Sequence, residues 1–136
     1  MEETNAKTLV RRWYEEMWNC WSFDLVDEIV APDVAFRGSL GVSTHGREGL
    51  KRYMRFVRDA FPDFHNHIEL LVAEGGTVVA KLSYSGTHAG EFQGIPPTQR
   101  RVTYAGVAIF DVVENRIQSA WVLGDLYSLH KQVGAY

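Results

Sequence analysis

The spacing of apolar residues changes once along this chain, at residues 61–63, and that change limits the fold to one class. Before it, in residues 5–21 and 47–60, large apolar residues recur every three or four positions, which is typical of amphipathic helices. After it, as in residues 68–72, apolar and polar residues alternate, which is typical of half-buried strands. Helices that precede antiparallel hairpins indicate an α+β fold.

The chain is 136 residues long and contains no repeat, low-complexity tract or linker. Because domains cluster around 100–150 residues, we expect a single domain over residues 1–136. We expect a curved antiparallel sheet that wraps around the N-terminal helices to form a cone. The expected helices are residues 5–21, 23–30 and 47–60, the expected strands are residues 34–37, 67–72, 77–84, 100–112 and 116–123, and residues 125–132 form a short final helix.

Composition excludes several classes of protein. One Cys cannot form an internal disulfide, which excludes a disulfide-rich secreted scaffold. No apolar run approaches the ~20 residues of a membrane-spanning helix, and the acidic, polar residues 1–5 are unlike a signal peptide. A net charge of −3 gives no basic footprint for nucleic acid. We therefore expect a cytoplasmic protein that engages neither nucleic acid nor a membrane.

Five stretches of the chain have the order and spacing of a known family: residues 45–49, 61–63, 86–98, 115–117 and 125–134. The most specific part runs from the His at position 88 to the Thr at position 98. Together the stretches resemble the SnoaL-like polyketide cyclases, also described as predicted ester cyclases, over nearly the whole chain. The resemblance implies a nuclear-transport-factor-2-like fold, also called a cystatin-like α+β barrel, around a deep pocket. It also implies homodimers or higher oligomers.

The resemblance further implies cofactor-free closure of a ring by intramolecular aldol condensation on a polyketide ester. In that family an acidic side chain on the last strand is the general acid and base, and its position here is Val122. Polar pocket positions of the family fall on Gly106 and Ala108, where it has a Gln and a His, and on Phe36, where it has an Asn. Because valine cannot move a proton, the shared fold does not carry the shared chemistry with it.

Two other enzyme types with this cone match less well. Ketosteroid isomerases use a Tyr on the first helix, which Tyr14 matches, but the position of their Asp base falls at about Gly38. Limonene epoxide hydrolases use an Asp–Arg–Asp relay on the sheet, and this sequence has no matching trio because its last strand carries no carboxylate.

Three residues are candidates for proton transfer. His88 is a natural acid or base near neutral pH, and Asp125 could orient it, since both stand at strand ends. The alternatives are that His88 only fixes the loop and that Asp125 caps the terminal helix. Tyr104 could bind a carbonyl or phenol oxygen inside the cone, or could be a core tyrosine with a buried acceptor.

The aromatic residues suggest a binding site for a small hydrophobic molecule. Trp18 and Tyr14 lie one helical turn apart and form the best pocket-lining pair, with plain core packing as the alternative. Gly106 and Ala108 lie beside Tyr104 and would widen the cone for a flat apolar ligand. The full expected ligand-binding set is Tyr14, Trp18, Phe36, Tyr84, Gly106, Ala108, Phe110 and Val122.

The opposite face of the same strands is too apolar for solvent, and a second copy of the chain is the simplest partner for it. We expect a homodimer through Thr103, Ala105, Val107, Ile109 and Trp121.

The histidines and the single cysteine give no metal or cofactor signal. His45, His65 and His67 lack ligand spacing, so we expect no metal and no cofactor. Cys20 has no adjacent base, so we expect a buried structural thiol.

The leading hypothesis is a SnoaL-like small-molecule enzyme, acting without a cofactor by aldol ring closure or a related isomerisation on a hydrophobic cyclic substrate. The alternative is a non-catalytic module that binds a hydrophobic small molecule, since Val122 stands at the acid/base position. A third reading is isomerase or hydrolase chemistry with a displaced catalytic group.

Overall fold

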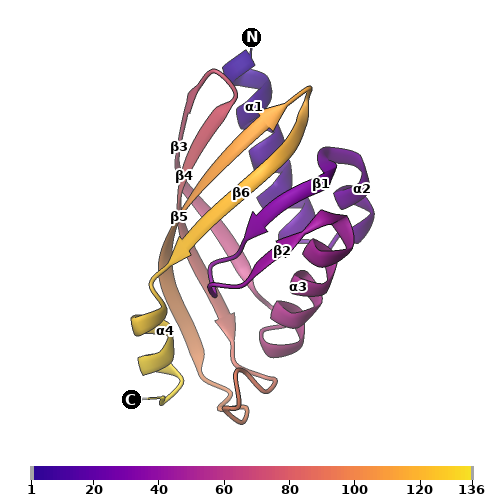
Figure 1. Cartoon of the computed structure of the whole chain (residues 1–136). Helices are drawn as coiled ribbons and strands as arrows, with labels where there is room; N and C mark the ends of the chain where they lie inside the picture. The colour runs from indigo at the N-terminus through magenta and orange to yellow at the C-terminus, as the bar shows by residue number, and fades with distance from the viewer. Residues whose placement is uncertain (1, 136) are drawn as a thin grey trace.

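A computed structural model describes residues 2–135 of the chain as helices packed on one six-stranded sheet (Figure 1). The helical segments are α1 (Glu2–Arg11), the π-helix η1 (Arg12–Trp18), α2 (Phe23–Ile29), α3 (Gly46–Ala60) and α4 (Leu126–Gln132). The strands are β1 (Val30–Arg37), β2 (Ser43–His45), β3 (His65–Glu74), β4 (Thr77–Thr87), β5 (Arg101–Val113) and β6 (Arg116–Gly124). The expected α+β class and order of elements are confirmed.

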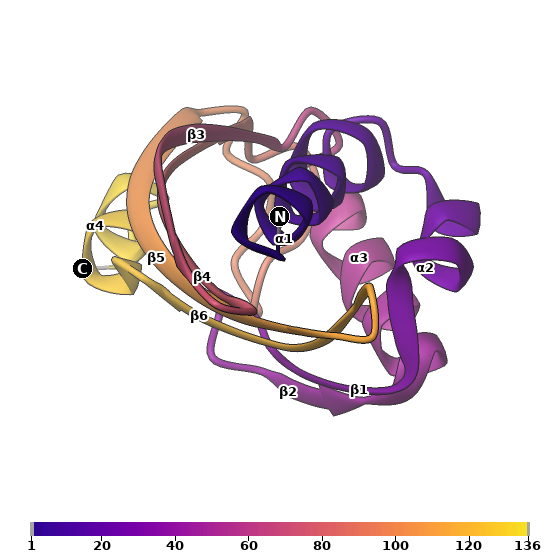
Figure 2. The ribbon, with the colours of Figure 1, turned by 90° about the horizontal axis from the view of Figure 1, so that it is seen from above.

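The strands lie in the order β2-β1-β6-β5-β4-β3. Every neighbouring pair is antiparallel except β1 and β6, which run parallel, since β1 precedes the helix α3 and the long hairpins follow it. Figure 2, which looks along α1, shows the sheet curling around that helix without closing. Bulges where the register shifts, in β1, β3 and β6, contribute to this bend.

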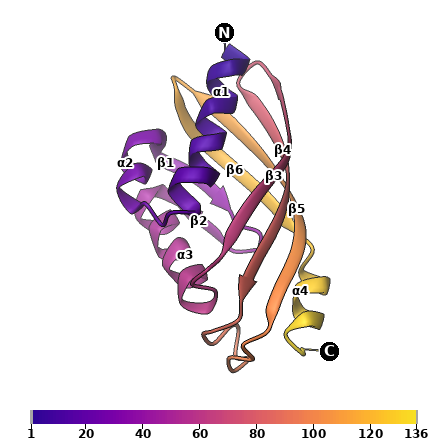
Figure 3. The same cartoon turned by 180° about the vertical axis from the view of Figure 1, so that it is seen from behind.

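Strand alternation decides which side chains reach the core. Along β5 the burial alternates without a break over the first ten residues, with Val102, Tyr104, Gly106, Ala108 and Phe110 facing inward. The helices α1 and η1 fill the concave side, as Figure 3 shows from behind. Phe110 lies at the centre of this packing, because its ring is 5.4 Å from Trp13 and 5.8 Å from Tyr14, centroid to centroid.

The long first helix differs from the expected regular α-helix. After Arg11 the turns widen, and the chain ends this segment with Asn19 N–H donating to the Tyr14 carbonyl at 2.9 Å, a bond that spans five residues. In such a turn residues five apart line up, so Trp13 and Trp18 both point into the core, where they are 1% and 5% exposed. The π-helix thus buries four neighbouring large side chains that a narrower helix would spread around its circumference.

The segment between α2 and α3 also differs from expectation. The predicted helix over 23–30 ends at Ile29, and β1 begins at Val30, before Pro32 rather than after it. The register between β1 and β6 is interrupted from Val30 to Ala35, so Pro32 sits where no ladder bond is required. The short strand β2 lies between the expected strand over 34–37 and the expected helix over 47–60, and it pairs with the end of β1.

None of the helices in residues 2–135 is both long enough and apolar enough to cross a membrane.

The packing of the first helix on β5 gives a testable prediction about stability. We expect Phe110→Ala to lower the free energy of unfolding by about 3–5 kcal/mol, because it leaves a cavity under two aromatic rings. Val113→Ala, at a half-exposed position on the same strand, should cost less than ~0.5 kcal/mol. Urea denaturation followed by circular dichroism measures both, and equal losses would contradict this account of the core.

Candidate functional site

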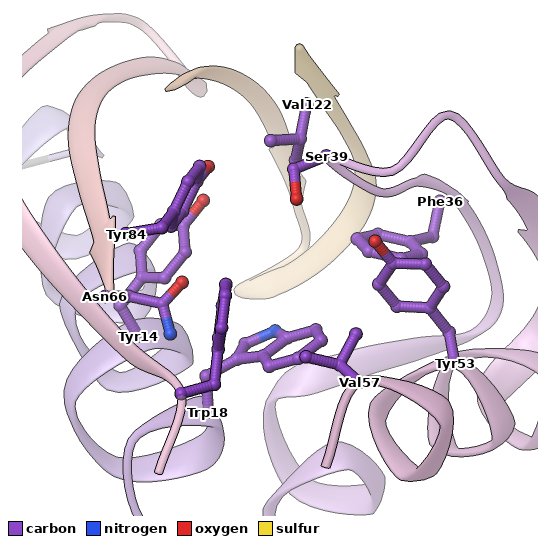
Figure 4. A pocket seen from close by; sticks show the side chains of 10 residues that line it. Tyr14, Trp18, Phe36, Ser39, Tyr53, Val57, Asn66, Tyr84 and Val122 are labelled. Atoms are coloured by element: carbon purple, nitrogen blue, oxygen red, sulfur yellow. The ribbon is translucent and has the colours of Figure 1, made fainter. Parts of the chain in front are cut away.

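One interior pocket lies between η1, α3 and the concave face of the sheet (Figure 4). It is enclosed by aromatic rings and a few polar groups, and its free space is about 20 Å³, room for about one water molecule. Its lining residues are Tyr14, Trp18, Phe36, Ser39, Tyr53, Val57, Phe64, Asn66, Tyr84 and Val122.

Glycines in the strands and loops make room for the tyrosine rings around this pocket. A Cβ added to Gly38 would stand 2.2 Å from the Tyr53 ring, and one added to Gly106 would stand 2.4 Å from the Tyr84 ring. The expectation that Gly106 widens the cone is therefore wrong, because the Tyr84 ring from the neighbouring strand occupies the space that the missing side chain leaves. The glycines position aromatic rings instead of opening a cavity.

One side of the site holds a chain of hydrogen bonds. The Ser39 hydroxyl and the Tyr104 hydroxyl are 3.0 Å apart. The Leu40 backbone N–H donates to the Tyr53 hydroxyl at 3.2 Å. Burial raises the pKa of Tyr53 to about 12, although the Leu40 N–H works against this rise, and burial raises the pKa of Tyr104 well above its usual range. Both phenols therefore stay neutral at physiological pH and hold the loop after β1 against the sheet.

The opposite wall carries two tyrosines without this support. The hydroxyls of Tyr14 and Tyr84 are buried, and neither has a hydrogen-bond partner in the structure. Burial is the main cause that raises the pKa of each far above its ordinary value. The contact between the two hydroxyls lowers the pKa of Tyr14 and raises that of Tyr84. Figure 4 shows the two hydroxyls close together beside Asn66.

Asn66 is itself held in place by the end of the first helix. Its side-chain amide and its backbone N–H both donate to Asn19 Oδ1, at 3.0 and 2.8 Å, and Asn19 donates back to the Asn66 carbonyl. This pair closes the pocket on the side of β3, and Asn66 is only 4% exposed.

His88 is buried, but it does not line the pocket. It follows β4 and packs between Phe61 and Phe92, with ring centroids 5.7 and 6.3 Å away. Its Nδ1 lies 3.0 Å from the Thr98 hydroxyl and accepts from the Thr98 backbone N–H at 3.3 Å. Its Nε2 has no partner. In this structure His88 ties the ends of the 88–99 loop together.

Asp125 does not meet His88. It is exposed, and its Oδ1 accepts from the Ser128 backbone N–H at 3.1 Å, so it caps α4. The alternative that Asp125 caps the terminal helix is therefore confirmed. The predicted pairing of Asp125 with His88 is absent from the structure.

The other predicted residues divide into two groups. Tyr14, Trp18, Phe36, Tyr84 and Val122 line the pocket. Tyr104, Gly106, Ala108 and Phe110 face inward on β5 but are not among the lining residues. Lining residues that the sequence analysis did not single out are Ser39, Tyr53, Val57, Phe64 and Asn66.

The lining residues include no carboxylate, imidazole or cation. What the pocket offers is neutral: phenol and alcohol hydroxyls, one amide and aromatic faces. Such groups can donate hydrogen bonds to an oxygen atom and hold a flat ring, but they do not supply a strong base near neutral pH.

Metal-ligating residues are dispersed in the part of the chain that the structure describes, where no three His, Cys, Asp or Glu side chains gather as a metal site would require. The expectation of a buried Cys20 is wrong, since its thiol lies at the exposed end of the helical segment, near the Glu15 carbonyl.

Comparisons with known proteins identify the family of this chain through a family model. A family model described as SnoaL-like polyketide cyclase matches residues 8–133. Nogalonic acid methyl ester cyclase from Streptomyces nogalater is 29% identical over 119 residues, covering 86% of this chain and 89% of that protein. A structure from Jannaschia sp. CCS1 assigned to the SnoaL-like polyketide cyclases superposes with a TM-score of 0.91 at 22% identity, over 99% of this chain and 95% of that one.

The structure of TsrD from Streptomyces laurentii superposes with a TM-score of 0.88 at 24% identity, over 100% of this chain and 99% of that one. At these identities the two structures establish only a shared fold. The assignment to a family rests on the family model that matches residues 8–133.

The buried tyrosines predict a loss of stability in alkali. Their pKa values in the fold exceed the value of about 10 in an unfolded chain, so the folded protein holds the phenol protons more tightly. The contribution of these protonated tyrosines to the free energy of unfolding should be fully present below pH ~10. It should decline as the pH rises toward and beyond 12. Denaturant unfolding at a series of pH values, with tyrosinate absorbance recorded in parallel, measures this. Ionisation of all the tyrosines before any loss of stability would contradict the burial described above.

Proposed function

The chain belongs to the SnoaL-like polyketide cyclase family, and we propose that it is a cyclase-type enzyme acting on a hydrophobic, aromatic polyketide ester. The proposal rests on one observation above the others. The interior of the cone is a site lined by aromatic rings, in which buried hydroxyl groups face the free space. The relative from Streptomyces nogalater, a cyclase for nogalonic acid methyl ester by name, supports an ester of this kind as substrate.

The proposed chemistry is an intramolecular aldol closure. A methylene between two carbonyl groups loses a proton, its carbon attacks a ketone of the same molecule, and the resulting alkoxide takes up a proton. Because Val122 and its pocket neighbours carry no base, the methylene proton goes to water. The protein's contribution is then orientation of the two reacting carbons and hydrogen bonding to the oxygen that gains negative charge.

One observation favours a second function. The position that aligns with the family's acid/base residue is Val122, which is 4% exposed and lines the pocket. An aromatic pocket with no proton-transferring side chain also suits a module that binds an aromatic ligand without converting it.

The two functions predict different turnover. We expect the wild-type protein to accelerate ring closure of nogalonic acid methyl ester over buffer, with no added cofactor, as followed by liquid chromatography of substrate and product. Val122→Asp should raise the rate further, by ~10²-fold, because it adds a general acid/base inside the pocket. Val122→Asn is the matched control, because asparagine has the shape of aspartate but does not titrate. This variant should close the ring at the wild-type rate.

A wild-type rate equal to buffer, with clear turnover by Val122→Asp, would contradict the enzyme proposal and favour the binding module. Melting temperatures of both variants, measured by circular dichroism, show whether the buried polar group has disturbed the fold.

We also propose that the chain forms a homodimer through the convex face of the sheet. Val107, Ile109 and Trp121 are 40–44% exposed there. Ile109 stands opposite Val79 on one neighbouring strand and Trp121 on the other. Thr103 and Ala105 continue the same exposed row along β5. A contiguous apolar surface of this kind costs free energy in water and is covered when two copies pack face to face.

A charge placed on that face should separate the copies. We expect Ile109→Glu to convert a dimer to a monomer in multi-angle light scattering coupled to gel filtration. Thr8→Glu, an equal charge change on the exposed side of α1, should leave the mass unchanged. A monomeric wild-type protein at micromolar concentration would contradict the proposed dimer.

A further inference from the structure

Two tyrosines at one wall of the pocket have hydroxyls that contact each other but make no well-formed hydrogen bond to the rest of the protein. Tyr14 comes from η1 and Tyr84 from β4, so two distant parts of the chain bring them together. They are 2% exposed, and neither hydroxyl has a hydrogen-bond partner in the structure. The neighbouring Tyr104 and Tyr53 hydroxyls, in contrast, pair with Ser39 and with the Leu40 N–H.

A buried hydroxyl without a partner is unfavourable by about 1–3 kcal/mol. The chain carries two such groups side by side, where phenylalanine would fill the same space without that cost. The free space of the pocket adjoins both hydroxyls, so an oxygen atom that entered it could accept a hydrogen bond from each.

Both rings are held so that the hydroxyls keep their direction. The Tyr84 ring stacks on Phe64 at 5.7 Å between centroids, with 21° between the planes, and its other side lies against Gly106. The Tyr14 ring meets Phe110 edge-on at 5.8 Å. Because the rings cannot turn freely, the pair is already arranged for a ligand, which lowers the entropy lost on binding.

The lining also restricts the kind of oxygen. Among the lining residues there is no Lys or Arg, so a carboxylate or phosphate would enter without a counter-charge. Burial raises the pKa of both tyrosines, so they are neutral donors. The remaining walls, from Trp18, Phe36 and Val122, are apolar and suit an aromatic ring. Because the free space holds about one water molecule, that ring enters only when these side chains move apart.

We propose that the hydroxyls of Tyr14 and Tyr84 donate two hydrogen bonds to one ketone, enol or phenol oxygen of an aromatic ligand. This site deepens the proposed function and rests on it for the aromatic substrate class. The same pair would stabilise negative charge that develops on that oxygen during ring closure.

The test uses a matched pair of ligands, 2-naphthol and naphthalene, which differ by one hydroxyl oxygen. Binding to the purified full-length protein is followed by the fluorescence of the ligand. We expect the wild-type protein to bind 2-naphthol at least tenfold more tightly than naphthalene. In Tyr14→Phe and in Tyr84→Phe this preference should fall below threefold, while the affinity for naphthalene is unchanged or higher.

Melting temperature gives a second readout. Each Phe variant should melt at or above the wild-type temperature, since it removes an unsatisfied polar group, whereas Tyr104→Phe should melt lower because it loses the bond to Ser39. Gly106→Ala keeps both hydroxyls but displaces the Tyr84 ring, so it should also lose the preference for 2-naphthol. Tyr127→Phe, at a 65% exposed position outside the pocket, is the control and should match the wild-type preference.

A wild-type protein with no preference for 2-naphthol, or Phe variants that keep it, would overturn the proposal and leave the two hydroxyls as a site for water alone. This result is independent of turnover. A preference for 2-naphthol without ring closure would refute the proposed reaction but leave the oxygen site standing. Ring closure without that preference would refute the oxygen site but leave the reaction standing.

Discussion

Packing of the first helix into the curved sheet is the interaction on which the rest of this protein depends. Val10, Trp13 and Met17 are almost fully buried against the concave face, and Phe110 at its centre contacts the aromatic rings of that helix. The widened turns of η1 are what bring Trp18 onto the same face. Without this layer, the inner face of β4 and β5 would be open to water and the pocket would lack its floor.

The pocket is a small gap in this packing. Its polar groups include the hydroxyls of the tyrosines that line it. Tyrosine rings lie over glycines, so the rings fill the apolar volume and only the hydroxyls remain to be satisfied. The loop after β1 satisfies two of them, through Ser39 and the Leu40 N–H. The other two face the free space, so the structure separates hydroxyls that stabilise the fold from hydroxyls that are available to a ligand.

Much of this arrangement could be predicted from local pattern. The alternation along β5 and β6 correctly indicated that Val122 and Tyr104 face inward, because side-chain direction in a strand follows from position alone. The pattern along β5 could not predict which side chain fills the space beside Gly106, because that side chain, the Tyr84 ring, belongs to the neighbouring strand β4. Ser39 and Asn66 were missed for the same reason: their partners lie 65 and 47 residues away, and no spacing rule links them. His88 and Asp125 lie in stretches that resemble the family, yet one closes a loop and the other caps a helix.

The absence of charge from the pocket lining decides which chemistry this cone can support. A carboxylate at position 122 would put a titrating group into a pocket whose lining otherwise offers only neutral hydroxyls, one amide and aromatic faces. With valine there, the hydroxyls of Tyr14 and Tyr84 have no anionic acceptor among the lining residues. The pocket thereby gives up rapid proton transfer and gains donors aimed at a ligand. Such a site favours substrates that are acidic enough to lose a proton to water and whose charge collects on one oxygen.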